Sequence, residues 1–187
     1  SIDIDYKALQ TRVGRFLKGS SQTLAKSLAA AGITLYEGRG VCAGKGQAIV
    51  RSEAGEEMLT TDNIILSRGS SSASCPGLAP DGDAVLDSTG VLNLPEVPES
   101  LIIVGAGAIG LELGDFFGMM GSKITIVEAA PHIAPTEDAD IAKEMDRVQS
   151  KAGRTCITGV MAKSLVTKDG QAELTLGDGR VLTASKA

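Results

Sequence analysis

A glycine-rich segment holds the residues best suited to chemistry. Gly105, Gly107 and Gly110 form the pattern G-x-G-x-x-G directly after the apolar run 101–104. In such a turn the first glycine tightens the chain, the second leaves room for a pyrophosphate, and the third lets the next helix pack closely. The start of that helix offers free N–H groups and the positive end of a dipole to an anion. The segment therefore predicts a dinucleotide site.

An acidic residue supports this prediction and indicates which dinucleotide binds. Glu128 ends the next apolar run, 123–127, and follows Gly110 at about the 20-residue interval expected for an acid that binds a ribose. A generic strand–helix–strand turn would not account for an acid at this place. A carboxylate accepts hydrogen bonds from both ribose hydroxyls and repels a 2′-phosphate. Because neither Arg nor Lys occurs at 129–131, we expect NAD(H) rather than NADP(H).

The elements after the second apolar run follow from apolar spacing and turn residues. Thr136 is expected to cap a helix over 137–153, whose apolar residues recur at helical intervals. The pattern over 160–184 predicts strands joined by turns at 169–170 and 178–179, since Asp-Gly is a frequent hairpin pair.

The N-terminal part of the chain mixes helix and strand patterns. Apolar spacing over 5–31 predicts two helical stretches divided at Gly19, and the run 33–37 predicts a strand. Short antiparallel strands are expected next, followed by a buried strand at 63–66. The Ser-, Pro- and Gly-rich segment 70–83 is expected to be a loop.

Composition excludes several classes of function. The chain has 187 residues, a net charge of −5 and only 3% aromatic residues. Nucleic-acid binding is not expected, since the cations are scattered and few aromatic rings are available for stacking. Glu112 and Asp115 interrupt the most apolar window, 101–121, so a membrane span is not expected either.

The cysteines and the single histidine do not form a recognisable reactive site. Cys42, Cys75 and Cys156 lie far apart, and His132 is the one histidine in the sequence. Neither a local redox pair nor a zinc cluster has this spacing. We therefore expect no metal site and no catalytic residue within these 187 residues.

Over essentially its whole length the chain resembles the flavin-dependent pyridine nucleotide–disulfide oxidoreductases, and most of all the dihydrolipoamide dehydrogenases among them. The glycine pattern alone is widespread, but here it is one of several matching segments in family order. These segments are residues 32–40, 61–70, 86–90, 97–113 and 121–128.

The resemblance implies an α/β fold: a Rossmann-like, three-layer FAD/NAD-binding fold with two partial dinucleotide-binding domains. Residues 1–95 would be the later part of the FAD-binding domain, and residues 96–187 the NAD-binding domain without its last strand. The implied cofactor-binding residues are Gly105, Ala106, Gly107, Ala108, Ile109 and Gly110 at the NAD pyrophosphate, Glu112 near the nicotinamide, Glu128 at the ribose, Val160 at the adenine, and Gly40 and Gly69 at the flavin dinucleotide.

The activity implied by the resemblance is dithiol oxidation, with hydride transfer from a flavin to NAD. This chain would be a segment of that enzyme without its redox disulfide and catalytic histidine, and inactive alone. Its partner would be a small dithiol or a lipoyl-carrying protein, and the parent a homodimer in the cytoplasm or an organelle matrix. The alternatives are another flavin disulfide reductase, an NADH oxidase, or a non-catalytic NAD-binding module. One departure from the family pattern is Ser67-Arg68, which stands where Ala-Thr is usual.

Overall fold

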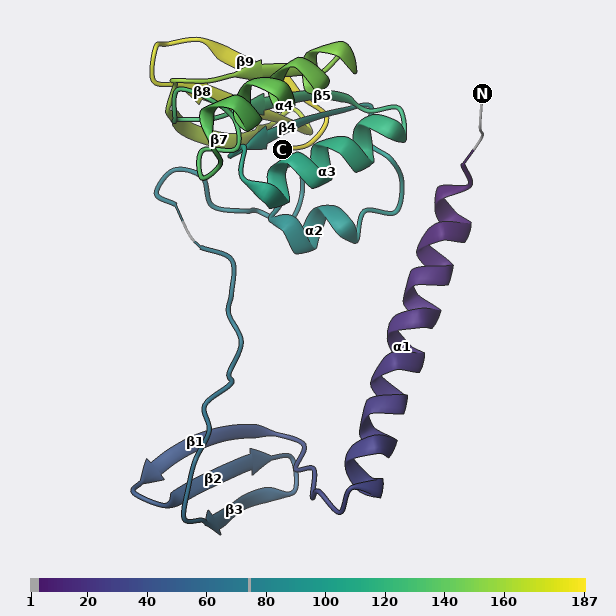
Figure 1. Ribbon diagram of the computed structural model, residues 1–187, viewed down its shortest axis with the longest axis vertical. Coiled ribbons are helices and arrows are strands. Elements are labelled where there is room, and N and C mark those ends of the chain that lie inside the picture. The colour runs from purple at the N-terminus through teal and green to yellow at the C-terminus, as the bar shows by residue number, and fades with distance from the viewer. Residues whose placement is uncertain (1–3, 74) are drawn as a thin grey trace. The chain divides into compact units, whose positions relative to one another are not determined.

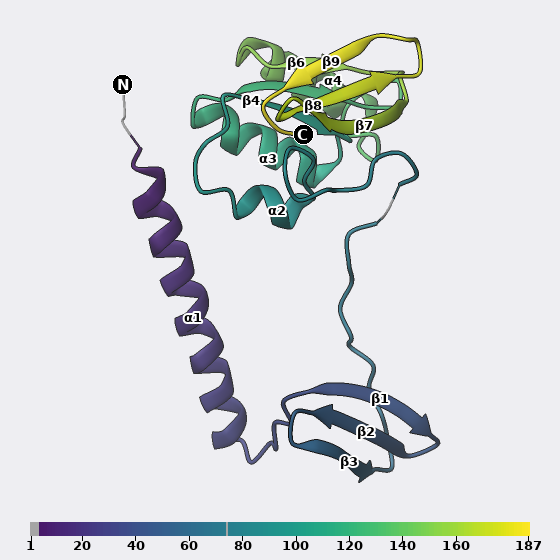
Figure 2. The same ribbon diagram turned by 180° about the vertical axis from the view of Figure 1, so that it is seen from behind.

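The computed structural model describes residues 4–73 and 75–187, which form two separate units. Ala8–Ser71 make up the N-terminal unit, and the C-terminal unit consists mainly of Ser72–Ala187. In the C-terminal unit a parallel sheet lies between helices on one face and an antiparallel sheet on the other (Figures 1 and 2). The glycine-rich segment belongs to this unit.

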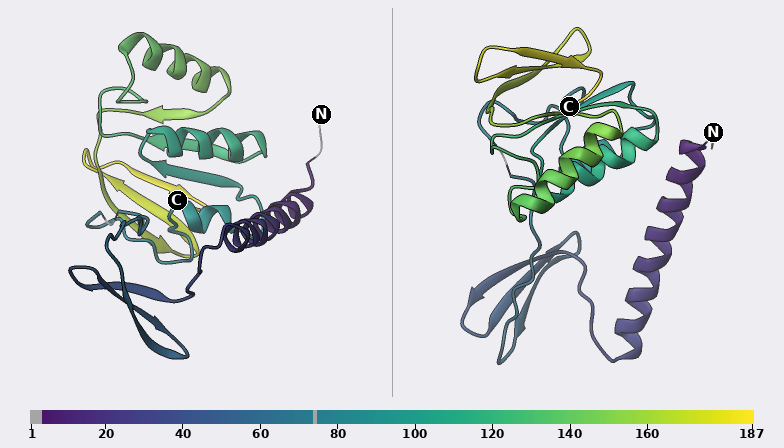
Figure 3. Two further views of the ribbon diagram at one scale, coloured as in Figure 1. Left: turned by 60° about the horizontal axis from the view of Figure 1, so that its bottom comes forward. Right: turned by 45° about the horizontal axis from the view of Figure 1, so that its top comes forward.

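The parallel sheet has the strand order β4-β5-β6, formed by Ser100–Val104, Lys123–Val127 and Thr155–Ile157. The strands run side by side in the same direction (Figure 3). Helix α3, Ala108–Met119, links the first two strands, and α4, Ala139–Lys151, links the second and third. Crossover connections between parallel strands are right-handed, and each of these two leads to the next strand in the same direction across the sheet. The two helices therefore cover the same face.

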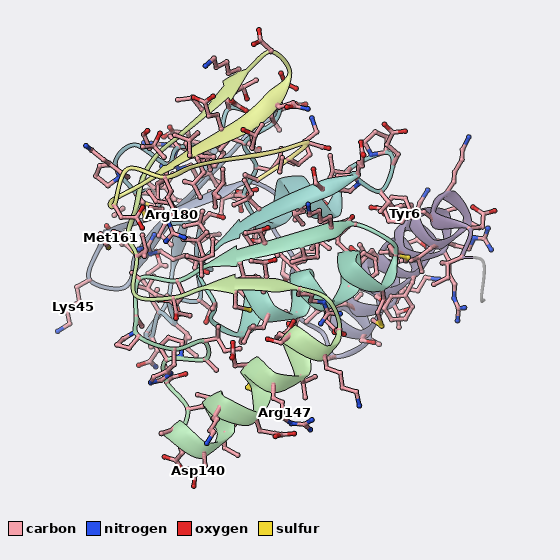
Figure 4. All side chains as sticks on the ribbon, turned by 90° about the horizontal axis from the view of Figure 1, so that it is seen from above. Tyr6, Lys45, Asp140, Arg147, Met161 and Arg180 are labelled. Atoms are coloured by element: carbon pink, nitrogen blue, oxygen red, sulfur yellow. The ribbon has the colours of Figure 1, made fainter. Side chains whose placement is uncertain are left out.

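Beneath these helices lies an apolar core. Phe117 is fully buried and meets Phe116 edge to face, with ring centroids 5.0 Å apart. Gly114 lets α3 approach the sheet, because a Cβ there would lie 3.2 Å from the Cδ1 atom of Ile126. The outer side of α4 is charged, and its labelled residues Asp140 and Arg147 point away from the strands (Figure 4).

The second face of the parallel sheet is covered by an antiparallel meander. Its strands are β7, Ala162–Lys168, β8, Gln171–Leu176, and β9, Val181–Ala184. Asp169 and Gly170 join the first two with φ values of 51° and 76°, so the hairpin predicted there is confirmed. Every second side chain of β8 points into the core, and these fully buried residues are Ala172, Leu174 and Leu176.

The N-terminal unit consists of one long helix and one small sheet. Helix α1 spans Tyr6–Ala30, and the antiparallel strands β1, β2 and β3 span Arg39–Gly44, Gln47–Ser52 and Gly55–Thr60. None of the residues 8–71 is buried, so this unit holds no core of its own. In the described part of the chain no helix, α1 included, is both long and apolar enough to cross a membrane.

Three predictions for this unit were wrong. Helix α1 continues through Gly19, because one glycine costs a helix only about 1 kcal/mol, and the Thr23 hydroxyl donates to the Gly19 carbonyl across that turn. The runs 33–37 and 63–66 are not strands, and Ile65 is 90% exposed. An apolar run becomes a strand only within a sheet, and neither run pairs with another strand among the described residues.

The predicted start of α4 was also displaced. The helix begins at Ala139 with Asp138 at its N-cap, whereas Thr136 was expected there. Thr136 instead donates its hydroxyl proton to the Glu137 carboxylate. The N–H of Glu137 bonds to the Ala134 carbonyl at 3.0 Å, so these residues form a separate turn before the helix.

Two short elements had not been predicted. Helix α2, Ser88–Leu92, is capped by Asp87, whose carboxylate accepts from the Gly90 N–H at 2.8 Å. Strand β6 has only three residues and pairs parallel to β5. Both are too short to show an apolar period in the sequence.

Candidate dinucleotide site

The glycine-rich turn joins β4 to α3. Gly105 follows Val104 with a φ of +104°, in the region that favours glycine, and its N–H donates to Val127 of β5 at 2.8 Å. Gly107 is the N-cap of α3 in extended conformation. Gly110 lies directly under the turn, because a Cβ at this residue would come within 2.1 Å of the Gly105 carbonyl oxygen. Two of the three glycines are thus required by the geometry of the turn itself.

The third glycine, Gly107, leaves an open space at the start of α3. A Cβ built on it would meet no other heavy atom within 4 Å. The next two residues, Ala108 and Ile109, are exposed, and the first intrahelical bond runs from the Leu111 N–H to the Gly107 carbonyl at 3.0 Å. The N–H groups before Leu111 have no intrahelical acceptor. They lie at the positive end of the helix dipole, as an anion site requires.

Glu128 meets this turn from the end of β5. Its Oε2 atom accepts from the Ala106 N–H, and its Oε1 atom from the Ala130 N–H, each at 2.7 Å. The Glu128 backbone is fixed as well, since its N–H donates to Ile157 and its carbonyl accepts from Val160 at 3.2 Å. The carboxylate therefore links the glycine-rich turn to the loop that follows β5.

Ala106 is held from both sides. This fully buried residue donates its N–H to Glu128 and accepts at its carbonyl from the Ala134 N–H at 2.9 Å. Ala134 adopts a φ of +49°, and the neighbouring His132 contacts the Ile133 carbonyl through Nδ1. No signal in the sequence indicated that Ala130 and Ala134 take part, because both contribute only backbone N–H groups.

Of the residues predicted for the NAD site, the structure gathers most in one place. Gly105–Gly110 form the turn, Glu128 bonds to it, and half-buried Val160 bonds to the Glu128 backbone. Glu112 is exposed on α3, one helical turn after Ala108 and on the same face.

The two glycines predicted for the flavin dinucleotide lie in the N-terminal unit. Gly40 belongs to β1 and pairs with Val50, while Gly69 follows β3 with a φ of +73°. At both positions a Cβ would meet no atom within 4 Å, so each leaves open space. The glycine-rich turn belongs to the C-terminal unit.

The three thiols belong to different parts of the chain, with Cys42 in the N-terminal unit and Cys75 and Cys156 in the C-terminal unit. Cys42 and Cys75 are exposed, whereas Cys156 is half-buried, and its burial raises the pKa of its thiol. Within residues 4–73 and 75–187, no group of three His, Cys, Asp or Glu side chains could hold a metal ion.

Comparison with known proteins identifies the family. The family profile described as "Pyridine nucleotide-disulphide oxidoreductase" matches residues 7–187. The chain belongs to this family. A member from Chlorobaculum tepidum named dihydrolipoyl dehydrogenase is 36% identical over 151 residues, which cover 80% of this chain and 32% of the relative. A dihydrolipoyl dehydrogenase from Bacillus subtilis is 32% identical over 198 residues, covering 98% of this chain and 42% of the relative.

Solved structures of similar oxidoreductases share the fold. LpdA from Mycobacterium tuberculosis superposes with a TM-score of 0.90 and 25% identity over 100% of this chain and 42% of its own. The flavoprotein disulfide reductase RclA from Escherichia coli gives a TM-score of 0.89 and 26% identity over 98% of this chain and 42% of its own. The predicted three-layer α/β fold is thereby confirmed. The chain spans less than half the length of each of these relatives.

Proposed function

We propose that this chain is the nucleotide-binding middle part of a flavin-dependent dihydrolipoamide dehydrogenase, where it holds NAD at the glycine-rich turn. The observation that carries the proposal is the contact between Glu128 and the Ala106 N–H at 2.7 Å. This contact joins an acid that is placed to bind a ribose to the start of a helix that is suited to binding an anion.

The residues around the turn fit a dinucleotide. A pyrophosphate would accept from the N–H groups at the start of α3, in the space that Gly107 leaves open. Each Glu128 oxygen uses one acceptor position on a backbone N–H, so others remain for the ribose hydroxyls. Val160 would lie beside the adenine. A 2′-phosphate would meet the Glu128 carboxylate, which favours NAD over NADP.

The remaining assignments follow from family membership. Residues 1–95 would belong to the FAD-binding domain, with Gly40 and Gly69 near the flavin dinucleotide, and residues 96–187 to the NAD-binding domain. When bound, FAD and NAD supply the hydride chemistry. The contribution of this chain is to bind and orient NAD, with exposed Glu112 on its nicotinamide side.

The dithiol chemistry is proposed to come from polypeptide beyond these residues. Cys42, Cys75 and Cys156 do not form a sequence-local pair, so this chain alone would be inactive. The absence of buried residues in the N-terminal unit supports a larger assembly, since its apolar side chains remain to be covered. The whole enzyme would act on a small dithiol or a lipoyl-carrying protein, as a homodimer.

Nucleotide binding is tested by titrating the folded chain with NADH and NADPH. We expect NADH to bind more tightly. Glu128→Ala should weaken NADH binding by about 1.5–3 kcal/mol, roughly tenfold to a hundredfold in Kd, and reduce the preference over NADPH. Glu96→Ala removes an exposed acid as a matched control and should leave both affinities unchanged. A folded chain that does not bind millimolar NADH would end the proposal.

The reaction is tested on a longer protein that contains this chain. NAD-linked oxidation of dihydrolipoamide would support the proposal. Likeness to RclA favours a second candidate, another flavin disulfide reductase, which would turn over a different disulfide. A purified protein without flavin absorbance would instead indicate a non-catalytic NAD-binding module.

A further inference from the structure

Three turns of the C-terminal unit carry the same dipeptide, Asp-Gly, at 81–82, 169–170 and 178–179. Every residue of these pairs is exposed. An aspartate can close a succinimide ring with the nitrogen of the next residue, and glycine has no side chain to hinder that step. Because dipeptide and exposure are alike, the hydrogen bonds of each turn decide whether its reacting groups are available.

In the first turn both reacting groups are hydrogen-bonded. The Oδ1 atom of Asp81 accepts from the N–H groups of Asp83 and Val85 at 2.9 and 3.0 Å. Its Oδ2 atom accepts from the Thr167 hydroxyl, the largest of the contacts that hold the pKa of the Asp81 carboxyl below its usual value. The Gly82 N–H donates to the Val85 carbonyl at 3.2 Å. Neither the carboxyl group nor the nitrogen is therefore available for ring closure.

The turn at 178–179 is protected in the same way. The Oδ2 and Oδ1 atoms of Asp178 accept from the Nε and the backbone N–H of Arg180, at 2.8 and 3.1 Å. The Gly179 N–H donates to the Leu176 carbonyl at 3.1 Å. The Arg180 side chain lowers the pKa of the Asp178 carboxyl, so less of the protonated form, which loses water most readily, is present.

The turn between β7 and β8 leaves both groups free. In the part of the chain that the structure describes, no donor bonds to the Asp169 carboxylate and no acceptor to the Gly170 N–H. Lys168 and Gln171 pair across the strands and close the hairpin without either group. A Cβ built on Gly170 would meet no atom within 4 Å, so there is room for a ring.

We propose that Asp169-Gly170 is a site of spontaneous isoaspartate formation in the folded chain. The Gly170 nitrogen bonds to Cγ of Asp169, and one carboxyl oxygen leaves as water with the amide proton and the carboxyl proton. Water then opens the succinimide at the α-carbonyl carbon, so that the backbone runs through Cγ and the mass is unchanged. The product exposes an α-carboxylate that isoaspartyl-specific carboxyl methyltransferases could methylate. This inference does not depend on NAD binding.

The modification would act on the core beside the turn. Isoaspartate adds one carbon to the backbone of a two-residue turn, whose length sets the pairing of Lys168 with Gln171. The next residue of β8, Ala172, is fully buried. We therefore expect the modified chain to melt at a lower temperature than the fresh chain.

Ageing of the folded chain at neutral pH tests the site. Peptide mapping with electron-transfer fragmentation measures isoaspartate at each Asp-Gly pair, because it distinguishes isomers of equal mass. We expect about tenfold more at 169 than at 81 or 178, since one hydrogen bond on the glycine N–H suppresses the open form by about that factor. In concentrated urea the three rates should converge, because the hydrogen bonds are lost and the dipeptides stay the same.

Asp169→Gly is the matched variant. It removes the carboxyl group, and Gly-Gly also suits a two-residue hairpin turn. This variant should form no isoaspartate at the turn, and its melting temperature should fall less on ageing than that of the parent chain.

Three results would overturn the proposal. Equal isoaspartate at the three pairs in the folded chain would show that the hydrogen bonds do not protect. A preference for 169 that persists in urea would show that the local sequence, not the fold, selects the site. An equal fall in melting temperature for Asp169→Gly and the parent would contradict the effect on the hairpin.

Discussion

Glu128 and Ala106 lie 22 residues apart in the sequence and are joined by a 2.7 Å hydrogen bond from the Ala106 N–H to the Oε2 atom. Ala106 is fully buried, so solvent would not replace this acceptor. The second oxygen of the same carboxylate accepts from Ala130. The acid proposed to bind a ribose thus also holds the turn that would bind the phosphates.

Glu128→Gln is therefore expected to destabilise the C-terminal unit even without nucleotide. An amide has one acceptor oxygen, so either the Ala106 or the Ala130 N–H loses its partner. Leaving a buried donor unsatisfied costs about 1–3 kcal/mol, which urea denaturation would measure. Glu96→Gln changes charge equally at an exposed acid and should unfold like the parent chain. Equal midpoints for both variants would contradict a structural role for the contact.

Substitutions at Gly107 and Gly110 should distinguish what NADH binding requires from what folding requires. Gly110→Ala places a Cβ 2.1 Å from the Gly105 carbonyl oxygen, so we expect a lower melting temperature together with weaker NADH binding. Gly107→Ala meets no atom within 4 Å and should melt at an unchanged temperature. It should still weaken NADH binding, because its methyl group occupies the space proposed for the pyrophosphate. Equal melting temperatures for the two variants would show that the turn is not rigid.

The sequence alone predicted the parts of the fold that depend on local signals. The turn at Gly105–Gly110 and the hairpin at 169–170 are local because glycine and Asp-Gly pairs set their backbone angles. The strands predicted at 33–37 and 63–66 are not formed, since an apolar run indicates burial but does not identify a strand partner. The Ala134–Ala106 contact was not predictable, because backbone hydrogen bonds between loops are independent of side-chain type.

Asp87 is expected to make the stability of the fold around α2 depend on pH. The backbone N–H of Gly90 and the hydroxyl of Ser72 hold the pKa of the Asp87 carboxyl below its usual value. A pKa that is lower in the folded state means that the ionised form stabilises the fold above the unfolded-state pKa of about 3.9. This contribution is lost as pH falls through the folded-state pKa.

The matched variant for this effect is Asp87→Asn, because asparagine also caps helices but does not titrate. We expect the difference in unfolding free energy between parent and variant to be constant above about pH 5 and to change below about pH 4. Comparing the two proteins at each pH cancels the titration of other carboxylates. A difference that stays flat down to pH 2 would show that the Gly90 contact does not favour the charged form.

The three thiols are expected to differ in reactivity. Burial raises the pKa of Cys156, mainly by desolvation, so less of the reactive thiolate is present at pH 8 than at an ordinary cysteine. Cys42 and Cys75 are exposed. A chromogenic disulfide reagent should therefore modify these two rapidly and Cys156 slowly in the native chain. In concentrated urea all three rates should converge, since unfolding removes the burial that separates them. Three equal rates in the native chain would place Cys156 at the surface and contradict its packing against the core beneath α4.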